Sequence, residues 1–384
     1  MNVEPRTFGS GWISGGASIV LGAMGFGGVL CLLFPAELTT PELRAVYPMG
    51  VIRALIELVI VLGFVLGLVS IVLRKSKVLG LTGLTLTVGA LLLGGWQVPI
   101  EGAVARSTYL GLDWFLLDLL MMSVLFVPLE RLFARVSQPI FRDEFATDLI
   151  YFFVGHVLIQ IFVFFTIAPA TTFFSWARHP SLQAAIASQP LLLQFLEIVF
   201  VSDLFFYWTH RIFHRVPFLW RVHAVHHSPR QMDWLAGSRL HILEIVIVRA
   251  VMFTPLFVFG FAESALRAYV VFVALHAVLI HANVRFNFGW LERLVATPRY
   301  HQFHHASDGE SIDKNFAVHL PWLDLAFGTQ YLPPNTWPAH MGIAGDPVPR
   351  NWWAQLVYPF RPSGGLRIPL LGHQERGERD ERQA

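Results

Sequence analysis

The fold is set by residues 191–227, which read LLLQFLEIVFVSDLFFYWTHRIFHRVPFLWRVHAVHH. The first half of this stretch is apolar and has the length of about 20 residues that a helix needs to cross the hydrocarbon core of a bilayer. The apolar run ends in two histidine motifs, HRIFH at residues 210–214 and HAVHH at residues 223–227. The stretch therefore predicts a membrane helix whose end carries a group of imidazoles.

The composition of the chain predicts the same setting. Of its 384 residues, 54% are hydrophobic and 14% are charged, whereas soluble domains carry about 25% charged residues. The surplus of apolar side chains favours an integral membrane protein. The net charge of +2 gives no basic surface for nucleic acid, so no nucleic-acid partner is expected. The single cysteine, Cys31, leaves no internal disulfide and no cysteine metal cage.

Further apolar windows along the chain qualify as membrane spans. The N-terminus lacks a clear signal-peptide pattern, so the first apolar window is expected to be retained. Pro169 and Pro255 are predicted to bend the windows that contain them. The spacing predicts an all-α, polytopic membrane helical bundle with a cytoplasmic, histidine-rich helical cap. The predicted spans are Ile19–Leu33, Val51–Leu73, Val78–Trp96, Leu112–Phe133, Leu149–Trp176, Leu191–Thr209, Ile242–Phe261 and Ala265–His281.

The orientation follows from the lysines and arginines of the short loops, which are enriched on the cytoplasmic side. Two basic clusters, one between the second and third spans and one after the fourth, fall on the same side when the spans are counted. The arginines around the histidine motifs fall on that side too, and Arg106 is the single exception. The basic residues are Arg74, Lys75, Lys77, Arg131, Arg135, Arg142, Arg211, Arg215, Arg221, Arg230 and Arg239.

A third histidine motif, HQFHH at residues 301–305, repeats the spacing of the second. Positions i, i+3 and i+4 share one face of a helix, so each motif is predicted to direct its imidazoles at one point. Neutral imidazole is a good ligand for iron, zinc and copper. Eight histidines are too many for one ion, so two ions are expected, and His281 completes the set. The predicted metal ligands are His210, His214, His223, His226, His227, His281, His301, His304 and His305.

The other histidines divide into two kinds. His276 lies five residues before His281, about 140° around an ideal helix, and its role as a ligand stays open. His241 and His319 are intermediate cases. The remaining four are interpreted as ordinary hydrogen-bonded residues near the membrane interface: His156, His179, His340 and His373.

Polar residues near the motifs are candidates for supporting roles. Asp203, Tyr207, His210 and His214 fall on one helical stripe. A metal-bound histidine commonly donates its second ring N–H to a carboxylate or a carbonyl. Asp203 and Tyr207 are therefore the predicted catalytic residues. Carboxylates that could serve the third motif are Asp308, Asp313 and Asp324.

This donor set favours oxygen chemistry over hydrolysis. Iron with open coordination positions can bind and cleave O₂. An unactivated C–H bond requires a strong oxidant, and this chemistry supplies one. A zinc hydrolase would use fewer ligands and a general base beside the motif, yet no HExxH sequence is present. A metal-dependent hydrolase and a histidine-rich metal transporter remain as alternatives.

The motifs together resemble those of the fatty acid hydroxylase superfamily, and within it the branch of sterol desaturases and alkylglycerol monooxygenases. The resemblance covers roughly residues 149–331 and includes HANV at 281–284, TPRYHQFHH at 297–305 and WLDLAFGT at 322–329. Leu323 separates a Trp and an Asp that are usually adjacent in the family, and Ile242 stands where relatives often have Pro.

The resemblance implies a membrane di-iron oxygenase that uses O₂ and external electrons to hydroxylate a lipid C–H bond. The lipid could be a sterol, a fatty acyl chain or an ether lipid, and a desaturase with the same centre is the alternative. No His-Pro-Gly-Gly haem motif is present, so a separate donor such as a ferredoxin or a cytochrome b5-type protein is implied.

Three segments are expected along the chain. Residues 1–140 form an N-terminal membrane module of about four helices, to which the sequence assigns no role. Residues 141–335 form the di-iron catalytic domain. Residues 336–384 form a C-terminal extension, whose charged end, Gln374–Ala384, is predicted to be disordered.

Overall fold

The computed structural model describes residues 9–99, 109–157, 159–345 and 347–361. Within these ranges every regular element is a helix, and β-structure is limited to two isolated bridges. The predicted tail Gln374–Ala384, His373 and Arg106 lie outside the described residues. The all-α prediction is confirmed for the part of the chain that the structure describes.

Among the described residues, seven helical segments are long and apolar enough to cross a membrane, which agrees with the predicted multi-pass helical membrane protein. The predicted span Leu149–Trp176 is different, because two shorter helices, α7 (Phe145–Val157) and α8 (Ile159–Phe173), take its place. At 1.5 Å per residue each is about 20–23 Å long, less than the hydrocarbon core. The seven candidates are Trp12–Leu33, Met49–Leu73, Val78–Gln97, Leu112–Leu132, Leu191–Arg215, Ile242–Phe259 and Glu263–His281.

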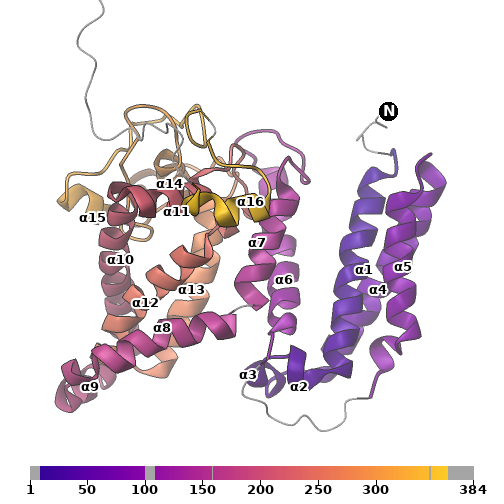
Figure 1. Ribbon diagram of the computed structural model, residues 1–384, viewed down its shortest axis with the longest axis horizontal. Helices are drawn as coiled ribbons and strands as arrows, with labels where there is room; N and C mark the ends of the chain where they lie inside the picture. Colours follow the sequence, from indigo (N-terminus) through magenta and orange to yellow (C-terminus); the bar gives the residue numbers. More distant parts are fainter. Residues whose placement is uncertain (1–8, 100–108, 158, 346, 362–384) are drawn as a thin grey trace, which may run out of the picture. The chain divides into compact units, whose positions relative to one another are not determined.

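The chain forms two compact units (Figure 1). The N-terminal unit comprises Met1–Ile140, Asp148–Pro169 and Ala282–Arg285, and the C-terminal unit comprises Phe141–Thr147, Ala170–His281 and Phe286–Ala384. Short 3₁₀ helices punctuate both: η1 (Gly95–Gln97), η2 (Ser175–Ala177), η3 (Ala236–Ser238), η4 (Gly289–Arg293) and η5 (Tyr358–Phe360).

The N-terminal unit is built on close helix packing. Helices α1 (Trp12–Leu33), α4 (Met49–Leu73) and α5 (Val78–Leu92) pack against one another through small residues, as is common where helices associate within a membrane. A Cβ atom on Gly83 would lie 1.9 Å from Oγ of Ser18. The Ser18 hydroxyl donates to the carbonyl of Gly63 at 2.6 Å, so one small polar contact joins α1 to α4.

The same unit contains the short helices α2 (Pro35–Leu38) and α3 (Pro41–Arg44) and the long helix α6 (Leu112–Leu132). His156 of α7, predicted to be an ordinary hydrogen-bonded residue, lies with Nε2 2.9 Å from the carboxylate of Asp118 and Nδ1 2.7 Å from the carbonyl of Phe152. A buried carboxylate of α6 thereby finds a partner.

The C-terminal unit has three long helices, α10 (Leu191–Arg215), α12 (Ile242–Phe259) and α13 (Glu263–His281). Their apolar contact includes Ile198 and Tyr269. Helix α12 contains Pro255, as expected, and ends at Gly260, whose φ of 69° permits the turn into α13. Helix α9 (Pro180–Ala187) precedes α10.

Short helices gather near one end of these long helices (Figure 1). They are α11 (Pro217–His227), α14 (Pro298–His304), α15 (Pro321–Ala326) and α16 (Trp352–Val357). Proline opens α11, α14 and α15, where its fixed φ suits the first helical turn and its missing N–H costs nothing. This helical cap contains two of the three histidine motifs.

Candidate metal centre

Four helices position the nine predicted ligands. Helix α10 carries the first motif in its last two turns and is followed directly by α11, which carries the second motif. Helix α13 ends on His281. The Thr297 hydroxyl accepts the N–H of Tyr300 and so starts α14, which carries the third motif.

The nine predicted ligands form two groups of imidazole nitrogens. Within each group, one nitrogen from every ring lies within 4.8 Å of the others. Site A is defined by His210, His214, His223, His227 and His304, and site B by His226, His281, His301 and His305. Each group has the donor type and spacing to hold one metal ion. The histidines that were left open, His276, His241 and His319, belong to neither group among the described residues.

The two HxxHH motifs are each divided between the sites, which corrects the prediction that a motif directs its rings at one point. His223 and His227 belong to site A, but His226 belongs to site B. In the third motif His301 and His305 belong to site B, with His304 in site A. The reason is geometric: positions i+3 and i+4 are neighbours in sequence and therefore 100° apart around the helix.

At site A the Nε2 atoms converge. Nε2 of His223 lies 2.9 Å from Nε2 of His210 and 3.1 Å from Nε2 of His227. Behind them, Nδ1 of His210 is 2.7 Å from the carbonyl of Phe316, and Nδ1 of His304 is 2.8 Å from the carbonyl of Lys314. A carbonyl can only accept, so these rings carry their proton on Nδ1 and present a lone pair at Nε2.

Carboxylates accept the Nδ1 proton of two further rings at site A. Nδ1 of His223 lies 2.7 Å from Glu244, and Nδ1 of His214 lies 3.2 Å from Asp313. Glu244 was not predicted, although a buried acid in the first turn of an apolar span was a usable signal, because such groups are costly in a membrane. Asp313 was predicted to serve the third motif and instead contacts the first.

At site B the Nε2 atoms also face one another. Nε2 of His301 lies 3.1 Å from Nε2 of both His281 and His305, and Nε2 of His226 lies 3.4 Å from Nε2 of His281. Nδ1 of His281 is 2.7 Å from the carbonyl of Ala277. Nδ1 of His226 also contacts a backbone carbonyl. Two of the four rings at site B therefore have a carbonyl partner at Nδ1.

That carbonyl belongs to Arg239, a fully buried arginine. Nδ1 of His226 lies 3.1 Å from it. The Arg239 guanidinium donates to Glu144 at 2.6 Å and to the Ser228 hydroxyl at 3.0 Å. The buried Arg142 is paired with Asp233 at 2.7 Å. From the sequence, these arginines served only as basic loop residues that indicate the cytoplasmic side; in the structure they hold the loop that supports site B.

Some buried ring nitrogens of the two groups have no hydrogen-bond partner in the described structure. At site A these are Nε2 of His214 and of His304, and at site B they are Nδ1 of His301 and of His305, behind rings whose Nε2 atoms face one another. An unsatisfied buried polar atom costs about 1–3 kcal/mol. A cation would satisfy the two unpaired Nε2 atoms of site A, and at site B it would bind the Nε2 atoms that face one another, so the residues present fit a pair of metal ions.

Burial also keeps the rings of the cap neutral. It is the main cause that lowers the pKa of His226, His227, His301 and His305 well below the usual value, and nearby histidines add to the effect. Burial lowers the pKa of His304 to about 3. Neutral imidazole is the form that binds metal.

The two predicted catalytic residues lie beside the site rather than in it. The carboxylate of Asp203 accepts the backbone N–H groups of Val318, His319 and Leu320 at 3.0, 3.1 and 2.6 Å. The Tyr207 hydroxyl is 2.8 Å from Oγ1 of Thr329. In the described structure, neither hydrogen-bonds to an imidazole of site A or site B, so their catalytic role stays a prediction.

Two other predicted carboxylates also support backbone. Asp324 accepts from the Tyr300 hydroxyl at 2.6 Å and from the N–H groups of Phe316 and Ala317, both at 2.8 Å. Asp308 accepts the N–H of Ala339 near the surface. Neither hydrogen-bonds to a ring of the third motif, for which they were predicted.

The histidines outside the sites have partners of their own. Nδ1 of His276 lies 3.0 Å from Nδ1 of His319, and Nε2 of His276 lies 2.9 Å from the carbonyl of Ala296. His241 caps α12 by accepting the N–H of Leu243 at 3.1 Å. These contacts are structural: they connect the cap to α12 and α13.

A helical membrane protein with two adjacent histidine sites at the end of its spans is the class defined by this geometry. Residues 195–329, which include all nine histidines, match the family model described as fatty acid hydroxylase. This segment is therefore similar to the fatty acid hydroxylase family, the resemblance that the motifs predicted. No solved structure matches.

Curated relatives show a similarity of the same kind. The chain is 29% identical over 179 residues to ornithine lipid hydroxylase OlsE of Rhizobium tropici, covering 47% of this chain and 54% of that protein. It is 34% identical over 127 residues to human alkylglycerol monooxygenase, covering 33% and 28%. It is 28% identical over 141 residues to methylsterol monooxygenase 1 of Gallus gallus, covering 36% and 46%. The matches thus span about half or less of each relative.

Proposed function

We propose that this protein is a membrane di-iron oxygenase that hydroxylates a C–H bond of a lipid, using O₂ and electrons from a separate donor. The observation that carries the proposal is the pair of adjacent sites A and B, made of nine imidazoles, eight of which belong to buried residues. Sets of five and four nitrogen ligands suit two redox-active ions better than one hydrolytic zinc ion, which typically takes three protein ligands.

In this proposal site A and site B each hold one iron ion. Bound iron supplies the activation of O₂ that an unactivated C–H bond requires. The chain itself excludes bulk water by burial, fixes the ring tautomers through Nδ1 contacts, and keeps the imidazoles neutral. Glu244 and Asp313 would strengthen the basicity of His223 and His214 by accepting their Nδ1 protons.

A lipid substrate is supported by the position of the sites and by the relatives. His210, His214 and His281 lie at the ends of candidate membrane spans, so a lipid can approach from the bilayer. The named relatives are hydroxylases or monooxygenases whose names specify an ornithine lipid, an alkylglycerol and a methylsterol. Hydroxylation and desaturation both begin with cleavage of a C–H bond. The names of the relatives favour hydroxylation of the two.

The cap is proposed to face the cytoplasm, where a ferredoxin or a cytochrome b5-type protein would deliver electrons. The arginine bias of the loops supports this side. Transport of metal ions is less well supported, because the ligands are dense and lie at helix ends, whereas a transit site needs sparse ligands along the spans.

Metal analysis and lipid analysis of the full-length protein test the proposal. We expect about two irons per purified chain and O₂-dependent addition of one oxygen atom to a lipid of cells that express it. His227→Ala should abolish that product, and His179→Ala, at an exposed histidine of the same unit, should not. Zinc as the only metal, together with turnover under nitrogen, would overturn the proposal.

A further inference from the structure

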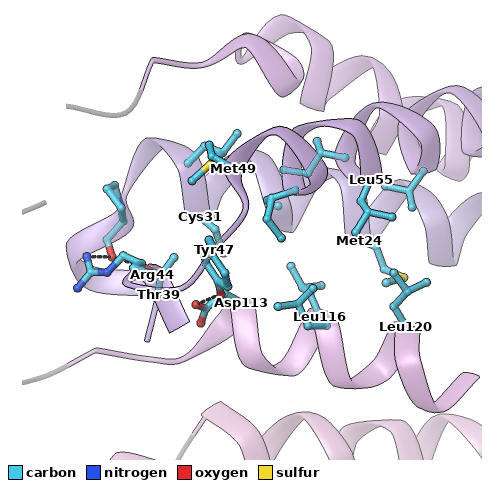
Figure 2. Close-up of a pocket in the computed structure, with 17 residues that line it drawn as sticks. Met24, Cys31, Thr39, Arg44, Tyr47, Met49, Leu55, Asp113, Leu116 and Leu120 are labelled. Carbon is cyan, nitrogen blue, oxygen red and sulfur yellow. Dashed lines mark hydrogen bonds between the residues drawn. The ribbon is translucent and has the colours of Figure 1, made fainter. Parts of the chain in front are cut away.

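A second site lies in the N-terminal unit, where neither the family match nor the metal sites extend. A cavity of about 260 Å³ lies between α1, α4 and α6 (Figure 2). Its wall is almost entirely apolar and includes Met24, Leu55, Ile56, Leu116 and Leu120. A cavity with such a wall inside a membrane unit is suited to a hydrocarbon chain rather than to a polar metabolite.

One end of the cavity is polar. Thr39, Arg44, Tyr47 and Asp113 lie there, while Met24 and Leu120 lie at the opposite end (Figure 2). The cavity is therefore amphipathic along its length, with the polar groups confined to one end.

The polar end lies at the level where the spans terminate. Helix α1 ends at Leu33, α4 begins at Met49 and α6 begins at Leu112. At 1.5 Å per residue, Met24 and Leu120 are about 12–14 Å further into the spans, which approaches the middle of a hydrocarbon core about 30 Å thick. This is the orientation of a bilayer lipid, with its headgroup at the interface and its chain along the helices.

At the polar end, Arg44 is the group that can bind an anionic headgroup. The Asp113 carboxylate is already satisfied, because it accepts the backbone N–H groups of Thr40 and Trp114 and the hydroxyls of Thr40 and Tyr47. The Arg44 guanidinium donates to the carbonyl of Pro35 at 2.7 Å, which is a neutral acceptor. A guanidinium has five N–H donors and matches the geometry of a phosphate.

We propose that this cavity binds one acyl chain of a membrane phospholipid, with the lipid phosphate at Arg44 and the chain between α1, α4 and α6. The proposal concerns residues of the N-terminal unit alone and does not depend on the chemistry of the metal sites.

Photolabelling of the full-length protein in lipid nanodiscs tests the chain site. The probe is a phosphatidylglycerol with a diazirine in the middle of one acyl chain, and labelled peptides are mapped by mass spectrometry. We expect Leu120→Trp, which fills the deep end, to lower labelling of the cavity residues about fivefold or more. The matched control, Leu125→Trp, lies on the same helix at a 48% exposed leucine outside the cavity and should leave labelling unchanged.

A diacylglycerol with the same diazirine chain tests the phosphate. It should label the cavity more weakly than phosphatidylglycerol, and Arg44→Gln should remove that difference. Lys75→Gln, at an exposed lysine of the same unit, is the charge-matched control. If Leu120→Trp lowers the melting temperature, Leu117→Trp replaces it, because Leu117 also lines the cavity.

Two outcomes would overturn the proposal. The first is labelling spread evenly over the lipid-exposed helix faces and insensitive to both filling variants, which would mean ordinary bilayer contact. The second is equal labelling by both probes with no effect of Arg44→Gln, which would mean that no phosphate is bound.

Discussion

At the scale of single residues, the supporting atom behind each ring is as informative as the ring itself. Four of the five rings in site A and two of the four in site B have a carbonyl or carboxylate partner at Nδ1, which leaves Nε2 directed inward. The remaining rings, His227, His301 and His305, have no such partner among the contacts described above. The rings that have an Nδ1 partner are oriented before any metal ion binds.

Removing the carboxylate behind His223 is the direct test of this support. Glu244→Ala is expected to weaken metal binding or activity by about 10–100-fold, the usual cost of losing such a partner. Glu244→Gln should retain part of the effect, because an amide oxygen still accepts the Nδ1 proton. Metal content and turnover are measured together, with Glu263→Ala, at a 79% exposed side chain, as the control. Unchanged metal content in Glu244→Ala would contradict the role given to this residue.

A buried histidine outside the sites makes stability depend on pH. Burial lowers the pKa of His319 to about 3, whereas an unfolded histidine titrates near 6.5. Between these values the unfolded state binds the extra proton, so stability is lost as the pH falls below about 6.5, by up to about 1.4 kcal/mol per pH unit.

His319→Gln should therefore flatten the fall in melting temperature between about pH 7 and pH 5, relative to the native protein. Its stability at neutral pH is compared first, because the variant also loses the contact with His276. Parallel pH profiles for the two proteins would show that His319 does not contribute to the acid sensitivity.

At the scale of elements, α11 and α14 each supply ligands to both sites. Substituting neighbouring residues should therefore affect different ions. His226→Ala is expected to impair site B and His227→Ala site A, so the residual iron of the two variants should differ in its Mössbauer spectrum. His301→Ala should resemble His226→Ala, because both rings belong to site B. Identical spectra for His226→Ala and His227→Ala would contradict the division of the motif.

The segment 316–320 is held against α10 by Asp203. Asp203→Asn replaces a carboxylate that accepts three backbone N–H groups with an amide that has a single acceptor oxygen. We expect a loss of about 2–3 kcal/mol of stability, since buried N–H groups become unsatisfied. The melting temperature is measured beside activity, with Asp308→Asn near the surface as the control. Lost activity at an unchanged melting temperature would instead favour the catalytic role predicted from the sequence.

At the scale of the whole molecule, the orientation of the cap can be tested directly. Thr336→Cys on the cap side and Ser181→Cys in α9, at the other end of α10, are both exposed positions. A membrane-impermeant maleimide should label Ser181→Cys in intact cells and Thr336→Cys only after permeabilisation. The native Cys31 is buried, so background labelling should be low. The reverse pattern would place the cap outside the cytoplasm.

The sequence predicted most of what periodicity controls. Spacing by three and four residues selected eight of the nine histidines that form the two groups, and His281 was added from the end of a predicted span; apolar length predicted seven of the candidate spans. It could not predict contacts that depend on tertiary structure. Glu244 meets His223 only because α12 packs beside α11, and Asp313 reaches His214 across 99 residues. The division of each HxxHH motif also required two helices to face one another, which no single motif encodes.

The burial of the rings has a kinetic consequence. Eight of the nine histidines expose 6% or less of their surface, so in the described structure the rings of both sites are shielded from solvent. Metal exchange would then wait for local opening of the cap, whose rate depends on its stability. Loading would be easiest while the cap is still assembling on the ends of α10 and α13, which makes metal supply during membrane insertion a determinant of how much protein becomes competent.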